Sequence, residues 1–150
     1  MVTLAEAASI GSRDKYLAVI ATLRADQTIQ TSLVNAGPMA DPETGEDVIA
    51  FVTYGPAKLA NLRARPQITV TFRAGWEWVA IEGRARIIGP DDPAPGFDGE
   101  RLRLLRREVF TAAGGTHDDW DEYDRVMAAE RRAAVLVTPT RIYSNKRTGT

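Results

Sequence analysis

Residues 54–62, YGPAKLANL, carry the side chains best suited to hold an anion. Pro56 suits the first position of a helix, where its missing N–H would be unpaired in any case. Lys58 and Asn61 are three residues apart, so they share one face of that helix, close to the free N–H groups of its first turn. Together with Tyr54, which precedes the turn, they form a seat suited to a phosphate. The alternative is that Lys58 is an ordinary solvated lysine.

The remaining composition argues against catalysis by side chains alone. The chain of 150 residues has no cysteine and one histidine, His117, and its formal net charge is −1. A lone histidine cannot build a histidine-rich metal site, and we find no catalytic triad. If the protein is an enzyme, a bound cofactor carries the chemistry. We therefore predict no catalytic residue and no metal site.

Charge and hydropathy also limit the partners and the location. A net charge near zero argues against bulk binding to nucleic acid or to an anionic membrane. No stretch approaches 18 uninterrupted apolar residues, and the first residues lack the basic and apolar regions of a signal peptide. We predict a cytoplasmic protein that acts on a small molecule.

Two charged clusters have ordinary interpretations. Residues 118–124 include five carboxylates, which suit the start of a helix better than a metal site. Arginines at 101–107 suit a solvated helix face, although they could instead attract an acidic cofactor tail. His117 is expected in a loop before a helix.

The elements that must position these residues are mostly strands. Apolar runs and breakers predict a mainly β, α+β fold in one domain, residues 1–150, with six strands in an antiparallel barrel and helices outside it. Residues 37–47 are expected to form a loop because Pro and Gly interrupt them. The predicted strands are 16–23, 29–35, 48–53, 67–73, 76–88 and 133–143; the predicted helices are 4–15, 56–65, 100–113 and one that begins after Asp118 or Asp119.

The strand predicted at 76–88 has an unusual outer face. Alternation places Trp76 and Trp78 on the face away from the core, beside arginines. Such a face needs a partner subunit, a helix or a flat ligand. Gly83 is a candidate β-bulge, and Pro139 in the last strand indicates an edge or a bulge. In the predicted helix 100–113, Leu104 is expected to point inward.

An ordered series of motifs now resembles a known family. The series begins with Gln30-Thr31-Ser32 in a polar strand, continues through residues 55–66 (GPAKLANLRARP) and 75–83 (GWEWVAIEG), and ends with DDWDEY at 118–123. It resembles the split-barrel flavin- and deazaflavin-binding family related to pyridoxamine 5'-phosphate oxidase. More narrowly, it is similar to the actinobacterial branch of reductases that use coenzyme F420. The likeness covers about residues 16–143.

The resemblance implies a six-stranded split β-barrel that forms a homodimer, with two cofactor sites at the interface. It implies that Lys58 and Asn61 hold the cofactor phosphate, within a site that includes Tyr54 and Pro56. It places Gln30 and Ser32 beside the cofactor ring. Trp76 and Trp78 would approach from the partner subunit.

Two departures accompany the resemblance. Relatives often carry a basic residue where this chain has Pro56, so one phosphate contact is expected to be missing. Many also have Asp-Gly in the first hairpin, where this chain has Asp26 and Gln27.

Three functional hypotheses follow. The leading one is an F420-dependent oxidoreductase that transfers hydride from the reduced deazaflavin to a conjugated small molecule. The second is an FMN-dependent oxidoreductase of the same fold, since Lys58 and Asn61 would serve that phosphate equally well. The third is a flavin- or deazaflavin-binding protein without turnover.

Overall fold

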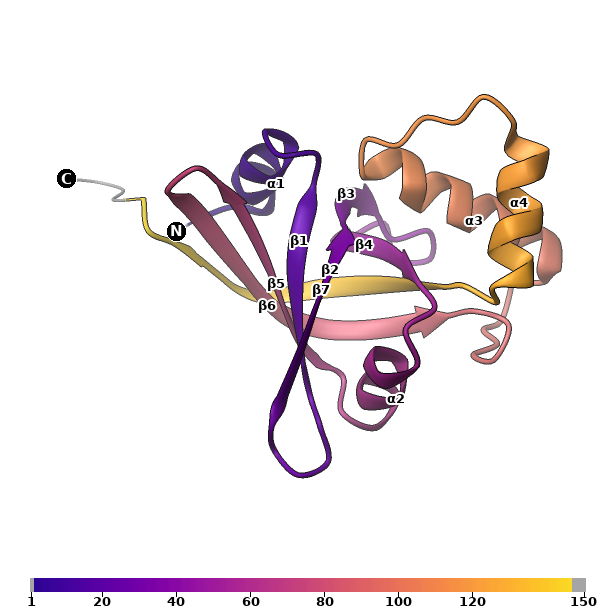
Figure 1. Cartoon of the computed structure of the whole chain (residues 1–150), viewed down its shortest axis with the longest axis horizontal. Helices are drawn as coiled ribbons and strands as arrows, with labels where there is room; N and C mark the ends of the chain where they lie inside the picture. Colours follow the sequence, from indigo (N-terminus) through magenta and orange to yellow (C-terminus); the bar gives the residue numbers. More distant parts are fainter. Residues whose placement is uncertain (1, 147–150) are drawn as a thin grey trace.

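The computed structural model describes residues 2–146 and contains one antiparallel sheet with four helices. The strand order is β2-β1-β5-β6-β7-β4-β3, and every neighbouring pair is antiparallel (Figure 1). The strands are β1 (Leu17–Leu23), β2 (Ile29–Asn35), β3 (Gly37–Ala40), β4 (Asp47–Thr53), β5 (Gln67–Ala74), β6 (Glu77–Ile88) and β7 (Ala133–Ser144). The helices are α1 (Leu4–Ser12), α2 (Pro56–Ala64), α3 (Gly99–Ala112) and α4 (Trp120–Ala129).

The sheet is curved but open. Its edge strands β2 and β3 are not paired with each other within the described residues. The prediction of a mainly β, α+β fold is confirmed. The predicted six-stranded split barrel is corrected to a sheet of seven strands that does not close. The additional strand is β3, which lies inside the predicted loop and pairs with β4. Pro38 is compatible with this position because β3 is an edge strand.

The predicted boundaries agree within a few residues elsewhere. The hairpin strand 29–35 is confirmed in full, and the helix expected at 4–15 ends at Ser12. The last strand extends one residue beyond the predicted 133–143 and ends at Ser144, and residues 147–150 lie outside the described residues. Within residues 2–146, no helix is both long and apolar enough to cross a bilayer.

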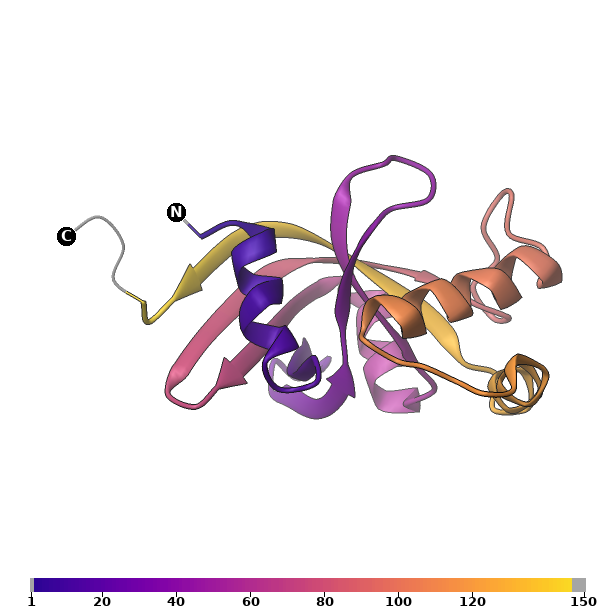
Figure 2. The same ribbon diagram turned by 90° about the horizontal axis from the view of Figure 1, so that it is seen from above.

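Two hydrophobic clusters lie on opposite faces of the sheet end formed by β4 and β7. The larger one packs the inner face of the sheet against α1 and α2, through residues such as Ile10 and Leu62. The smaller one packs α3 against β4 and β7, through Leu105 and Val109. Figure 2 shows α3 and α4 together at one end of the sheet. Leu104, expected to point inward, is instead exposed.

The pairing of β6 with β7 is irregular at a glycine. The pairing with β7 shifts register between Glu82 and Gly83, and Pro139 lies opposite Gly83. A Cβ atom on Gly83 would lie 2.4 Å from the carbonyl oxygen of Thr138, so only glycine fits there. The predicted bulge is therefore confirmed. Trp76 lies in the turn before β6 rather than in the strand, which begins at Glu77.

Candidate functional site

The strand–turn–helix unit predicted from residues 54–62 is present. β4 ends at Thr53, Gly55 is the N-cap of α2, and Pro56 is its first residue. The Gly55 N–H donates to the Thr53 hydroxyl (3.2 Å), which fixes the turn. No side chain caps α2, so its first-turn N–H groups have no side-chain acceptor.

Lys58 is buried rather than solvated, with 5% of its surface exposed. Its Nζ donates to the Thr53 hydroxyl (3.0 Å) and lies 5.7 Å from the centre of the Phe51 ring. Within residues 2–146, no carboxylate forms an ion pair with it. Burial lowers the pKa of the Lys58 ammonium, and the nearby charge of Arg132 lowers that pKa further. Such a cation attracts an anionic ligand.

A pocket of about 620 Å³ opens beside Lys58. This volume lies in the range of small-molecule sites. Apolar and aromatic side chains form most of its wall, and Lys58 and Arg132 contribute cations to the lining. The lining residues are Leu33, Val34 and Asn35 of β2; Val52, Thr53, Tyr54 and Gly55 around the end of β4; Lys58; Val109, Phe110 and Ala113 near the end of α3; and Tyr123, Met127 and Arg132.

Tyr54 and Lys58 are the predicted site residues among those that line the pocket, and most of the lining was not predicted. Arg132 follows α4, and its guanidinium lies 4.2 Å from the centre of the Tyr54 ring. Phe110 and Tyr123 bring the helices α3 and α4 to the pocket. Their helical spacing predicts only packing, since nothing local in the sequence shows that α3 and α4 reach the end of β4.

Asn61 lies away from the pocket lining, in a short chain of hydrogen bonds. Its Nδ2 donates to the Thr22 hydroxyl (3.0 Å), and that hydroxyl donates to Oε1 of Gln30 (3.0 Å). Asn61 and Thr22 are both buried. The chain therefore ties α2 to the β1–β2 hairpin, and it brings the predicted residues Asn61 and Gln30 together.

Ser32 shares the inner face of β2 with Gln30. Alternation along β2 places these two residues and Val34 on the same side, and all three are partly buried. The Ser32 hydroxyl is buried and has no hydrogen-bond partner within the described residues. Because an unpaired buried hydroxyl is costly, this atom is a candidate ligand contact.

Trp76 and Trp78 lie elsewhere in the chain and do not line the pocket. Trp76 is 94% exposed, and the Trp78 ring meets the Tyr143 ring edge-on with centroids 6.1 Å apart. The same outer face of the sheet exposes Val19 and Leu33, which are paired across β1 and β2. Within residues 2–146, no element covers this apolar face.

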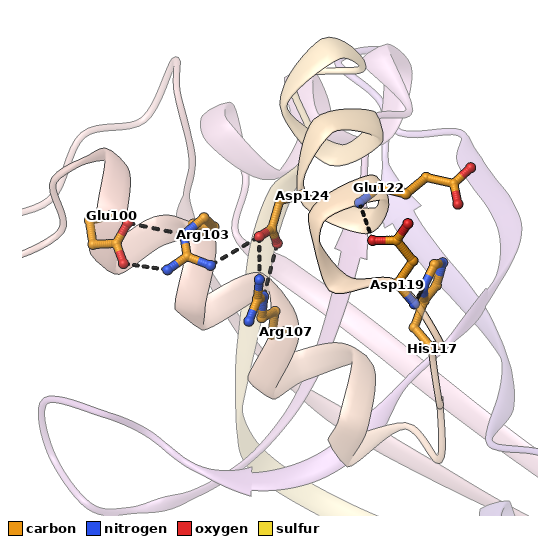
Figure 3. Close-up of polar contacts among 7 residues, drawn as sticks. All are labelled: Glu100, Arg103, Arg107, His117, Asp119, Glu122 and Asp124. Carbon is orange, nitrogen blue, oxygen red and sulfur yellow. Dashed lines mark hydrogen bonds and ion pairs between the residues drawn. The ribbon is translucent and has the colours of Figure 1, made fainter.

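The arginines of α3 are mostly engaged by acidic neighbours (Figure 3). Arg103 and Arg107 both donate to the carboxylate of Asp124 on α4, and Arg103 also pairs with Glu100. Arg107 and Arg103 hold the pKa of Asp124 below its usual value. These bonds join α3 to α4, and they leave little of the positive charge of the α3 arginines for a ligand.

His117 lies in the loop before α4, as expected. Its Nδ1 accepts the N–H of Asp119 (3.0 Å), and the Asp119 carboxylate caps α4 by accepting the N–H of Glu122 (3.1 Å; Figure 3). The acidic residues here serve the helix start and the α3 contact. Among residues 2–146, no group of three or more potential metal-ligating side chains comes together.

The fold has relatives of known structure. A conserved hypothetical protein from Mycobacterium tuberculosis is 21% identical, with a TM-score of 0.66 over 96% of this chain and 84% of that chain. An F420 reductase is 16% identical, with a TM-score of 0.57 over 86% of this chain and 90% of that chain. A FAD-binding protein from Mesorhizobium loti is 13% identical, with a TM-score of 0.59 over 95% of this chain and 94% of that chain. At these identities the likeness shows the fold.

Fold and sequence together define the class. The antiparallel sheet with its surrounding helices is the fold shared with these relatives. The sequence profile of the pyridoxamine 5'-phosphate oxidase family matches residues 5–146. The chain belongs to this family, and the predicted family resemblance is confirmed.

Proposed function

We propose that this protein binds F420 in the pocket beside Lys58 and uses it to reduce a conjugated small molecule. The observation that carries the proposal is the buried ammonium of Lys58, which faces a pocket without a carboxylate partner in the described residues. The F420 reductase among the structural relatives supports the choice of F420. Family membership supports an oxidoreductase.

The residues present fit a phosphate-bearing cofactor. Lys58 would hold the phosphate, assisted by the uncapped first turn of α2. Pro56 supplies the helix start but no N–H, and Tyr54 forms part of the pocket wall. Because its amide is bonded to Thr22, Asn61 acts in this proposal by positioning α2 against β1.

The inner face of β2 would contact the ring system of the cofactor. Gln30 has its carbonyl oxygen occupied by Thr22, whereas the Ser32 hydroxyl is free to bond a ring heteroatom. Burial of a ring edge here would satisfy the otherwise unpaired Ser32 oxygen.

A second copy of the chain would complete the site. The outer face of the sheet carries exposed Val19, Leu33, Trp78 and Tyr143, and a partner subunit would cover it. In such a homodimer, Trp76 and Trp78 of one subunit would approach the cofactor held by the other. A single subunit leaves both tryptophans outside the pocket.

The chemistry would come from the cofactor and the geometry from the protein. When bound, the reduced deazaflavin supplies a hydride to an electron-poor acceptor. Hydride transfer depends on close, aligned partners, so positioning and exclusion of water are the main contributions of the chain. The apolar wall from Val109, Phe110 and Met127 suits a flat, conjugated acceptor.

The test is a pair of fluorescence titrations of the purified protein, one with F420 and one with FMN. We expect F420 to bind and Lys58→Met to weaken it, while Lys146→Met, which alters an exposed lysine, leaves it unchanged. Tight binding of FMN with none of F420 would replace this proposal by an FMN-dependent oxidoreductase, an assignment that the FAD-binding relative would support. F420 binding without oxidation of the reduced form by a panel of enones and quinones would indicate a binding protein without turnover.

A further inference from the structure

A helix-ending turn carries Arg132 to the edge of the pocket. After α4, Arg131 adopts a left-handed conformation (φ +51°). The Arg131 N–H donates to the Ala128 carbonyl and the Arg132 N–H to the Met127 carbonyl, both at 3.0 Å. This is a Schellman motif, which here has arginine where glycine is usual. The turn reverses the chain, and Arg132 directly precedes β7.

The backbone of Arg132 is also fixed from the core side. Its carbonyl accepts Nε of Arg106 (2.9 Å), a side chain with only 6% of its surface exposed. The Tyr123 hydroxyl in turn donates to the Arg106 carbonyl (3.0 Å). The turn after α4, Arg106 of α3 and Tyr123 of α4 therefore hold the backbone of Arg132 in place. A fixed backbone is typical of a preorganised binding group.

The protein orients the side chain of Arg132 but leaves some of its hydrogen-bond donors unused. Its guanidinium lies over the Tyr54 ring, and its Nε donates to Glu130 (2.8 Å). Within residues 2–146, its two terminal nitrogens form no hydrogen bond to the protein. The planar fork that remains open is the part of arginine that binds a phosphate through two parallel contacts.

Arg132 and Lys58 line the same pocket, and the charge of Arg132 adds to burial in lowering the pKa of Lys58. Glu130 engages one edge of the arginine, while no carboxylate engages the lysine in the described part of the chain. Two cations converging on a pocket are destabilising unless an anion lies between them. Pro56, exposed at the start of α2, adds neither a charge nor an N–H.

We propose that Arg132 is a second phosphate-binding residue, and that it grips, together with Lys58, the phosphate group of the bound cofactor. This inference rests on the proposed function, because it assigns a further residue to the same site. Lys58 supplies a point charge from α2, whereas Arg132 supplies a directional fork from the α4–β7 turn. Together, Lys58 and Arg132 make the pocket selective for a ligand that carries a phosphate over the corresponding ligand without one.

The experiment compares three ligands and three proteins. FMN, F420 and riboflavin, which lacks the phosphate, are titrated into wild type, Arg132→Gln and Arg131→Gln. Arg131 is the matched control because it is adjacent, exposed, and paired with Asp91 at the surface. Loss of a charge-assisted contact predicts that Arg132→Gln weakens the phosphate-bearing ligands about tenfold or more and leaves riboflavin within about twofold. Arg131→Gln should leave all three affinities unchanged.

A measurement without ligand tests the same inference. The chain has only three lysines, so the side-chain NMR signal of Lys58 can be followed across pH. Removing the neighbouring charge in Arg132→Gln should raise the pKa of Lys58. An unchanged pKa would show that the two cations do not share one site, and would overturn the inference.

The binding outcomes separate the two proposals. If wild type binds F420 and Arg132→Gln binds it equally well, the inference is overturned and the proposed function stands. If wild type binds FMN but not F420, the proposed function is replaced, and the effect of Arg132→Gln on FMN affinity still decides the inference. An equal loss of riboflavin binding also overturns it, since the residue would then shape the pocket generally. If wild type binds none of the three ligands, the proposed function fails and the inference fails with it.

Discussion

Replacing Lys58 by methionine should stabilise the ligand-free protein while weakening its binding of cofactor. Burying an ammonium costs several kcal/mol. The Thr53 hydroxyl returns about 1.5–3 kcal/mol and the Phe51 ring about 0.5–2 kcal/mol, so the two contacts offset most of that cost but not all of it. Methionine keeps the packing, and Thr53 still accepts the Gly55 N–H. We expect a net gain of about 1 kcal/mol, or about 2–4 °C in Tm for a chain of this size.

The pH dependence gives this prediction a second signature. Folding lowers the Lys58 pKa below 10.5, so the unfolded chain binds more protons between the lowered pKa and 10.5. Wild-type stability should therefore rise with pH across that window, and Lys58→Met should lack this component of the rise. The gain in stability of Lys58→Met over wild type is therefore largest at neutral pH.

The assay is urea unfolding of wild type, Lys58→Met and the exposed control Lys146→Met, at pH 7 and at pH 9.5, without and with F420. Saturating cofactor should reverse the order, because about 100-fold excess over Kd adds about 2.7 kcal/mol to the protein that binds it. A ligand-free Lys58→Met that is less stable than wild type at pH 7 would refute the reasoning. The contacts of Lys58 within the protein would then offset the full cost of burying its ammonium group.

Three further predictions concern the frame around the site. Trp78→Ala should weaken self-association in sedimentation experiments while the circular dichroism spectrum is retained; an undiminished dimer that binds cofactor normally would contradict the shared site. Arg131→Gly should be more stable than Arg131→Ala by about 0.5–1 kcal/mol in urea, because the left-handed turn suits glycine; equal stabilities would argue against that turn. Asp124→Asn should lose about 1 kcal/mol at pH 7, a figure discounted for partial exposure. Because the folded-state pKa of Asp124 lies below 3.8, this loss should shrink as pH falls through that lowered pKa, and a loss that stays constant to pH 2 would exclude the ion pairs as its cause.

Sequence reasoning succeeded for the elements that are determined by a few neighbouring residues. The hairpin strand 29–35, the helix start at Pro56 and the bulge at Gly83 follow from alternation, proline geometry and the opposing Pro139. The strand β3 was missed because Gly37 and Pro38 are typical of loops. Its pairing with β4 is a tertiary contact that no local signal encodes.

The site was predicted only in part for the same reason. Lys58 was found through its place in α2, but its burial depends on Phe51 and Thr53, which lie on a neighbouring element. Arg132 was missed because a left-handed arginine, not a glycine, ends α4. The predicted interfacial role of Trp76 and Trp78 stays a prediction, since it concerns a second copy of the chain.

The most direct test of the central claim is a crystal structure of the protein with F420 bound. We expect phosphate oxygens within about 3 Å of Lys58 Nζ and of the terminal nitrogens of Arg132, the distance of charge-assisted hydrogen bonds. We also expect the ring system along the inner face of β2, near Ser32, and closed by the tryptophans of a second subunit. A phosphate bound elsewhere, with Lys58 still bonded only to Thr53, would contradict the account.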